Sequence, residues 1–389
     1  MSTTSETAAT RTLPSLAEVG EPRRNVGLDL LRFIAILLTL MRHMTPEPPA
    51  SLPPALRGAL QVLIHGAWMG VDLFFVLSGF LVSGLLFREF RNEGEVSFTR
   101  FFIRRGLRIY PAFFVLLLGY GAIEHVLTRS VTPAHFLSEA FFLQNYLPGL
   151  WNHTWSLAVE EHFYITIGLL VALLARTRRG LSTLPAILCA TFVLCLTLRM
   201  LCFESFAGAV TAQSQFRFDA LAFGVLISWL RHFHTEKFRA WTRAKPLLLT
   251  LGVALVTPCY MARFDGWDVE TWGLTSTYVG CGLMVAAVAM DDRSPGRVSR
   301  WLAGLGSHSY STYLWHMAVK RGFSVLRQRN VLVLPYFGEL AAFVIASFLF
   351  GSLMSRAVEL PVLRLRERYF PGIERRRHVR AREASPESP

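Results

Sequence analysis

Long runs of apolar residues recur along most of the chain and are separated by short polar segments. Ten of these runs approach the roughly twenty residues that a helix needs to cross a bilayer. Seven of the ten contain few or no charged residues: 67–87, 109–127, 181–201, 246–262, 271–290, 301–319 and 336–355. The pattern therefore predicts an all-α protein, a polytopic bundle of membrane helices, because only helices and closed barrels satisfy their backbone in lipid.

The other three runs carry ionisable residues inside an otherwise apolar stretch. They are 28–44 with Asp29, Arg32 and His43, 153–174 with Glu160, Glu161 and His162, and 216–232 with Arg217 and Asp219. Leaving out any one of them would invert the orientation of every later segment. We therefore expect about ten transmembrane helices, with both termini in the cytoplasm.

Composition and charge agree with a lipid environment. Of 389 residues, 52% are hydrophobic and 17% are charged, whereas soluble chains are about one quarter charged. Lys and Arg number 40 against 27 Asp and Glu, a balance that in a soluble protein would indicate nucleic acid as a partner. With ten spans, most of these cations fall on the cytoplasmic side, as the positive-inside rule requires. We therefore expect a lipid bilayer as partner and no nucleic acid.

The two ends of the chain differ from its middle. Residues 1–25 are rich in Ser, Thr, Ala and Glu, and residues 366–389 are basic and end in Ser, Pro and Glu. Such compositions are typical of disordered segments. We expect cytoplasmic tails at 1–25 and 366–389 around one transmembrane domain at 26–365.

The ionisable residues of the first run are the strongest functional signal, because a charge at mid-span costs about 2.5–3.5 kcal/mol and tends to mark a site. Arg32 and His43 lie on one helix face, within about 20° of each other and about 16 Å apart along the axis. By itself the pair is equally compatible with an Arg that reaches the headgroups and a His at the helix end.

Further sequence blocks follow this first one in a fixed order. They are 70–81, 104–111, 154–164, 217–224, 306–316 and 359–361. Together with Arg, ten residues and His in 28–43, they resemble the family 3 membrane acyltransferases, polytopic enzymes that O-acylate envelope glycans and some secreted metabolites. The resemblance covers about residues 25–365. Arg42 replaces an apolar residue of the family pattern, and His162 stands where Gln is more usual.

The resemblance implies an O-acetyltransferase-like enzyme that moves an acyl group, acetyl by default, from cytoplasmic acyl-CoA to a hydroxyl of an extracytoplasmic or membrane-associated carbohydrate. In the family, the Arg and His of the first block are regarded as essential. His43 is therefore expected as general base or acyl carrier, since His titrates near neutral pH. Arg32 is expected to orient the donor or to stabilise charge. Direct transfer and an acyl-His intermediate both stay open.

Arg105 and Arg108 match an Arg-x-x-Arg element that the family is thought to use for the phosphates of the donor. The alternative is a positive-inside anchor without a ligand. Residues expected to support the site are Asp29, Asp72, Glu160, Tyr164 and His316. We also expect buried ion pairs of Asp72 with Arg32 or Arg42, and of Arg217 with Asp219 or Glu160.

We expect acyl-CoA as co-substrate and no tightly bound cofactor. We also expect no metal, because the five Cys lie in apolar stretches and no His pair has ligand spacing. The expected location is the bacterial inner (plasma) membrane. The acceptor, the oligomeric state and the role of an outer cation cluster at Lys320, Arg321, Arg327 and Arg329 stay open. A polytopic transporter is the alternative class, although the sequence shows no internal repeat and no matched pair of broken spans.

Overall fold

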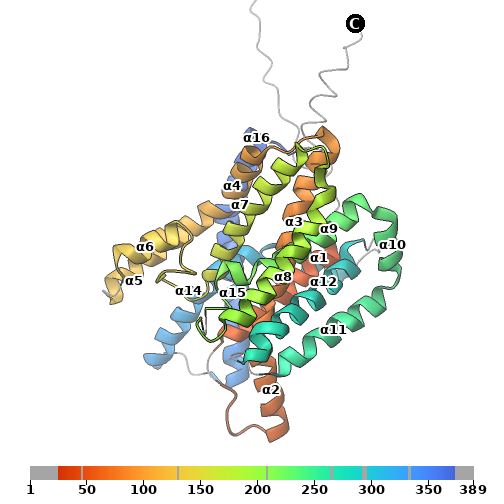
Figure 1. Cartoon of the computed structure of the whole chain (residues 1–389). Coiled ribbons are helices and arrows are strands. Elements are labelled where there is room, and N and C mark those ends of the chain that lie inside the picture. Colours follow the sequence, from red (N-terminus) through yellow and green to blue (C-terminus); the bar gives the residue numbers. More distant parts are fainter. Residues whose placement is uncertain are drawn as a thin grey trace, which may run out of the picture.

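The computed structural model describes residues 25–44, 47–128, 131–206, 209–262, 266–290, 296–331 and 334–372. Within these ranges the chain forms helices and no strand (Figure 1), which confirms the all-α prediction. The expected tails lie almost wholly outside the described residues. Residues 366–369, however, belong to the last helix rather than to a tail.

The first eight α-helices carry the blocks of 28–43, 70–81, 104–111 and 154–164. They are α1 (Val26–His43), α2 (Pro54–Gly66), α3 (Met69–Glu93), α4 (Phe98–Val115), α5 (Gly121–Thr128), α6 (Pro133–Ala140), α7 (Trp155–Ala175) and α8 (Leu184–Cys202). The remaining eight are α9 (Phe218–Phe233), α10 (Thr235–Arg243), α11 (Lys245–Met261), α12 (Leu274–Ala289), α13 (Arg297–Ser307), α14 (Ser309–Gln328), α15 (Tyr336–Met354) and α16 (Leu360–Tyr369).

Six helical stretches of the described chain are long and apolar enough to cross a membrane. They are Pro54–Glu93, Phe98–Val126, Trp155–Ala175, Gly180–Cys202, Val269–Ala289 and Tyr336–Tyr369. The bent pair α10 and α11 would make a seventh. The run at 301–319 is divided between α13 and α14, and α1 and α9 carry charges inside their length. The count of about ten spans and the placement of the termini stay predictions.

Helix α3 lies at the centre of the bundle, where it packs against α1, α7, α9 and α12. Glycines permit its closest approach to α9, since a Cβ at Gly79 would fall on the carbonyl of Leu221 and one at Gly224 on the carbonyl of Val76. Small residues at such crossings let helix backbones meet, as is common where lipid removes the hydrophobic drive for association.

Buried ion pairs fix the same helices, but not in the combinations expected from the sequence. Arg217 at the start of α9 donates to Asp72 of α3 at 2.7 Å, and Arg199 of α8 donates to Asp219 at 2.7 Å. The pairing of Asp72 with Arg32 or Arg42 was wrong, because the α3–α9 crossing brings Arg217 to Asp72. Arg32 instead pairs with Asp29, one turn earlier on α1, at 2.6 Å.

Two ends of the bundle can be told apart (Figure 1). Helix α16 lies near the top of that view and α2 at the bottom, and we call these the α16 end and the α2 end. Helix α1 starts beside the end of α12, where Asn25 donates to the carbonyls of Val288 and Ala289. It finishes at His43, toward the α2 end.

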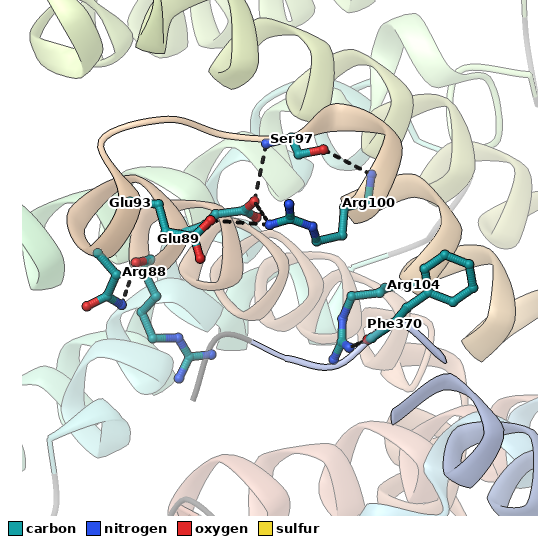
Figure 2. A network of polar contacts seen from close by, with 8 residues as sticks. Arg88, Glu89, Glu93, Ser97, Arg100, Arg104 and Phe370 are labelled. Carbon is teal, nitrogen blue, oxygen red and sulfur yellow. Dashed lines mark hydrogen bonds and ion pairs between the residues drawn. The ribbon is translucent and has the colours of Figure 1, made fainter. Parts of the chain in front are cut away.

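A polar network closes the α16 end at the turn between α3 and α4 (Figure 2). Gly94, with φ +75°, ends α3 in the left-handed conformation that glycine adopts without strain. Arg100 donates to Glu89 at 3.0 Å and to Glu93 at 3.2 Å. Arg104 pairs with Glu367 of α16 at 2.7 Å and donates to the carbonyl of Phe370. The first two arginines of α4 are thus neutralised by carboxylates.

Candidate active site

A cavity of about 250 Å³ lies between α1, α3, α4, α7 and α14. Four arginines line it: Arg32, Arg88, Arg105 and Arg108. The only carboxylate among the lining residues of the described chain is that of Glu160. The rest of the wall is largely apolar, from residues such as Leu77, Leu81 and Leu85. Cations at one part of an apolar wall suit a ligand that joins an anionic head to an apolar or weakly polar arm.

Arg105 is held in the cavity wall by two of the residues predicted to support the site. Its guanidinium lies over the ring of Tyr164, 4.1 Å from the centroid, and donates to the Tyr164 hydroxyl. Tyr164 in turn donates to Glu160 at 2.9 Å, and Ser78 donates to the other oxygen of Glu160 at 2.6 Å. The carboxylate of Glu160 is thereby fixed, and Arg105 is oriented through the tyrosine.

Arg108 lies one turn further along α4 and lines the same cavity. Within the described part of the chain its guanidinium has neither a hydrogen bond nor an ion-pair partner, in contrast to Arg100 and Arg104. A planar, permanently charged fork without a carboxylate is a ready site for a phosphate group. The predicted Arg105 and Arg108 pair is therefore brought to one cavity, together with Arg32.

His43 lies beyond the cavity, in contact with α14. Its Nδ1 is 2.9 Å from the carbonyl oxygen of Thr39 and 3.2 Å from Nε2 of His316. The two imidazole rings lie 4.9 Å apart between centroids. The structure thus joins His43 to His316, which the sequence had offered only as a supporting residue.

Tyr313 connects the cavity with this histidine pair. It lines the cavity, and its hydroxyl contacts Ser156 Oγ at 2.6 Å and the carbonyl of His153 at 2.5 Å. Its own carbonyl accepts from Nδ1 of His316 at 2.5 Å. One residue therefore touches both the cavity and His316.

His153 is a third histidine here, and the sequence analysis did not assign it to the site. Its ring lies edge-on to His316, with centroids 5.1 Å apart, and its Nε2 is 3.4 Å from the carbonyl of Leu314. The available signal was its position directly before the block 154–164. Within the described ranges no group of three His, Cys, Asp or Glu is arranged to hold a metal ion.

Glu139 of α6 fixes the loop that carries His153. One of its carboxylate oxygens accepts from the backbone N–H of Leu150 at 2.9 Å and from Thr154 Oγ1 at 2.9 Å. The residue is fully buried, and loss of hydration raises the pKa of the Glu139 carboxyl to about 7, although these hydrogen bonds act in the opposite direction. Sequence reasoning gave no sign of this residue.

The remaining predicted residues divide between the site and the scaffold. Asp29 accepts from Arg32 at 2.6 Å and so belongs to the cavity wall through its partner. Asp72 does not line the cavity, because it is buried in the contact of α3 with α9 and pairs with Arg217.

Comparison with known proteins relates this chain to one protein family. The family described as "Acyltransferase domain" matches residues 25–356. The chain belongs to the family 3 acyltransferases. The match spans every helix that contributes to the cavity and both histidines of the pair, and it confirms the resemblance carried by the ordered blocks.

Curated relatives carry O-acetyltransferase names. A "Putative O-acetyltransferase" of Staphylococcus aureus (strain COL) is 26% identical over 86% of this chain and 56% of its own length. The "Putative peptidoglycan O-acetyltransferase YrhL" of Bacillus subtilis (strain 168) is 25% identical over 75% of this chain and 48% of its own. "O-acetyltransferase OatA" of S. aureus (strain NCTC 8325 / PS 47) is 21% identical over 80% of this chain and 53% of its own length. The chain thus spans about half the length of these relatives. No solved structure gives a significant match to it.

Proposed function

We propose that this protein is a membrane O-acetyltransferase that moves an acetyl group from acetyl-CoA to a hydroxyl of an envelope carbohydrate, with His43 as the reactive base. Membership of the acyltransferase family and the names of its relatives support acetyl transfer. The observation that carries the proposal is the cavity, whose wall holds four arginines against one carboxylate and also includes Tyr313, the neighbour of the histidine pair.

The donor fits this cavity in one direction. Its phosphates bind Arg108 and Arg105, and its pantetheine arm lies along the leucines of α3 toward Tyr313. A volume of about 250 Å³ is below the roughly 300–1,000 Å³ of pockets that enclose a whole ligand. The cavity therefore takes the thioester arm with a short acyl group, and the nucleotide stays at the mouth.

His43 provides the base. A carbonyl oxygen only accepts hydrogen bonds, so the contact with Thr39 requires that Nδ1 of His43 carries the proton. Nε2 then has the free lone pair, and it makes no hydrogen bond within the described residues. In direct transfer Nε2 takes the proton of the acceptor hydroxyl as its oxygen attacks the thioester carbonyl, the C–S bond breaks, and the proton passes to the departing thiolate.

The covalent route uses the same atom. Nε2 attacks the thioester carbonyl, the C–S bond breaks and CoA leaves as thiolate, which gives an acyl-imidazolium with its proton still on Nδ1. The acceptor oxygen then attacks the acyl carbon, the C–N bond to Nε2 breaks, and the hydroxyl proton passes to the thiolate. Arg32 lies in the cavity wall on the same helix, where its charge stabilises the oxyanion or orients the donor in either route.

The membrane location follows from the apolar helices. Six to seven helical stretches are long and apolar enough to cross a bilayer, which supports a cavity inside a membrane domain. We assign it to the bacterial plasma membrane, with the arginine-rich α16 end facing cytoplasmic acetyl-CoA and the α2 end facing the carbohydrate.

The test uses purified protein in lipid nanodiscs. Release of free CoA from acetyl-CoA is followed alone and with a panel of peptidoglycan fragments and other envelope glycans, and mass spectrometry identifies an added acetyl ester. We expect slow hydrolysis of the donor alone and faster turnover with the acceptor. His65→Gln, which changes an exposed histidine of α2, serves as the matched control. Absence of binding and turnover of any acyl thioester, with ligand-dependent solute flux in liposomes, would contradict the proposal and favour a transporter.

A further inference from the structure

The contact between His316 and His43 determines which nitrogen of each ring carries a proton. His316 is fully buried on α14. Its Nδ1 is 2.5 Å from the carbonyl oxygen of Tyr313, which only accepts, so this nitrogen is the donor. In the neutral ring Nε2 is then an acceptor, and this is the atom that faces His43 Nδ1 at 3.2 Å.

The two rings are therefore complementary. His43 Nδ1–H is shared between the carbonyl of Thr39 and the lone pair of His316, and the chain of donors runs from His43 through His316 to Tyr313. In the opposite tautomer of His43 the single lone pair of Nδ1 would face two acceptors, the lone pair of His316 Nε2 and the carbonyl oxygen of Thr39, and neither contact would be a hydrogen bond. Of the two neutral tautomers of His43, only the one protonated at Nδ1 satisfies all these contacts.

We propose that His316 is a positioning residue that holds His43 in the Nδ1–H tautomer and orientation, so that Nε2 is free to act on substrate. This inference rests on the proposed function, because it assigns a role toward the same base. His316 does not touch the cavity itself; it acts through His43 and through Tyr313.

His316 has the role that the carboxylate has behind the histidine of a hydrolase triad, because it accepts the Nδ1–H of His43. Its acceptor nitrogen is neutral, whereas the carboxylate of a triad is charged. When His43 gains a proton at Nε2, its positive charge is stabilised at Nδ1 by two acceptors that are already in place. A carboxylate in this fully buried position would need a further partner to offset its loss of hydration. An imidazole performs the same orientation without that cost.

His153 supports His316 from the other side. Its ring packs edge-on against that of His316, and its backbone carbonyl accepts from the hydroxyl of Tyr313. The loop that carries it is held by Glu139. The acceptor nitrogen of His316 is thus fixed by contacts on α14 and on the segment before α7, which limits rotation of its ring.

The first experiment replaces His316 by two amides of different reach. In His316→Gln the side-chain amide extends to the position of Nε2 and can still accept from His43, whereas in His316→Asn it reaches only the position of Nδ1 and cannot. We expect kcat for acetyl transfer to fall about 10²-fold or more in His316→Asn and His316→Leu, and about tenfold or less in His316→Gln. KM for acetyl-CoA should stay within about threefold, because the donor site is untouched. His65→Gln again provides the control.

The second experiment needs no activity. Protein labelled with ¹⁵N in its histidine rings is studied by NMR in nanodiscs, with His43→Gln and His316→Gln used for assignment. We expect His43 as the Nδ1–H tautomer and a scalar coupling between its Nδ1 and Nε2 of His316, the signature of an N–H···N hydrogen bond. In His316→Leu the coupling is absent, and the fraction of His43 in the Nδ1–H tautomer falls, because only the carbonyl of Thr39 then favours that tautomer.

The outcomes separate the two proposals. Equal loss of kcat in the Gln and Asn variants, or a wild-type protein without the coupling, would overturn the role of His316 even if acetyl transfer is observed. A protein without any acetyl transfer but with the coupling and the single tautomer would contradict the proposed function and leave the positioning of His43 supported. Thermal unfolding of each variant identifies those that fail to fold. If the His316 variants fail to fold, the presence or absence of the coupling in the wild-type protein decides whether His316 positions His43.

Discussion

The Arg105 guanidinium stacks on the ring of Tyr164 and also donates a hydrogen bond to its hydroxyl, so one tyrosine fixes both the plane and the direction of the arginine. Arg108, one turn away on the same helix, faces the same cavity without any such partner in the described chain. The two arginines of one short motif thus have different surroundings. We infer that Tyr164 orients the Arg105 guanidinium before any ligand binds, whereas Arg108 gains its partner when an anion binds.

The first prediction follows from that difference. Arg108→Ala should raise KM or Kd for acetyl-CoA by about 10- to 100-fold with little change in thermal stability, because only a charged contact to the ligand is lost. Arg108→Lys should recover part of the affinity, since a point charge replaces a bidentate fork. Affinity is measured by isothermal titration in nanodiscs.

The control for this experiment is Arg239→Ala on α10, which removes one charge from an exposed residue. Arg105→Ala should lower affinity as well, but it should also reduce stability by about 1 kcal/mol, because Tyr164 loses the guanidinium that stacks on its ring and donates to its hydroxyl. Unchanged donor affinity in the Arg105→Ala, Arg108→Ala double variant would leave these residues as topology anchors.

Most of the site could be predicted from the sequence, because its residues lie in blocks with a fixed local geometry. Arg32 with Asp29, and Glu160 with Tyr164, are each within one turn of a helix, so helical spacing allows their contacts, although the sequence analysis paired Asp72 with Arg32 or Arg42. The ordered blocks identified His316 and the arginines of α4. The all-α class followed from apolar runs alone.

The contacts that depend on how helices cross could not be predicted. The partner of Asp72 is set by the approach of Gly79 and Gly224, which no local pattern shows. The roles of Glu139 and His153 depend on a loop between helices, where hydrophobic periodicity carries no signal. The roles of these residues could be recognised only from the folded structure.

The cation cluster that the sequence predicts on the outer side has a partial explanation in two ion pairs at the end of α14. Arg327 lies 3.5 Å from Glu339 of α15, and Arg321 lies 3.8 Å from Glu124 of α5. Both pairs are partly exposed and contribute little energy. They link the end of α14 to its neighbours, which accounts for two of the four cations without an anionic acceptor.

A second prediction concerns His43. His43→Ala should lower acetyl transfer by about 10²- to 10⁴-fold while leaving the affinity for acetyl-CoA within about twofold, because His43 is the proposed base and does not line the cavity. Arg32→Ala should reduce both transfer and affinity, since Arg32 lines the cavity. Both quantities are measured on one nanodisc preparation. Near wild-type transfer by His43→Ala would show that another group is the base.

A third prediction separates scaffold from site. Asp72→Asn leaves the buried charge of Arg217 without its counterion, so it should lower the free energy of unfolding by about 3–5 kcal/mol. The protein that remains folded should keep its KM for acetyl-CoA, because neither residue lines the cavity. The measurement compares yield and thermal unfolding with kinetics normalised to folded protein. A large change in KM at normal stability would place Asp72 in the site.

The pH dependence of stability gives a way to examine the loop that carries His153. Burial raises the pKa of Glu139 from 4.5 to about 7, so the folded protein binds a proton that the unfolded chain has already released between these values. Where the folded state holds more protons, stability falls as pH rises. The contribution of Glu139 is therefore most favourable below pH 4.5, weakens between about pH 4.5 and 7, and is constant above.

The last prediction is that Glu139→Gln removes this slope. Glutamine keeps an oxygen that can accept from Leu150 and Thr154, but it has no proton to lose. Wild-type stability should decline by on the order of 3 kcal/mol between pH 4.5 and 7 from this residue, and the decline should be largely absent in the variant. Thermal unfolding in nanodiscs at pH 5, 6, 7 and 8 measures it, with Glu236→Gln on exposed α10 as the control that keeps the wild-type slope. Parallel curves for wild type and Glu139→Gln would mean that Glu139 stays ionised across this range, and that the loop before α7 is held by a charged carboxylate.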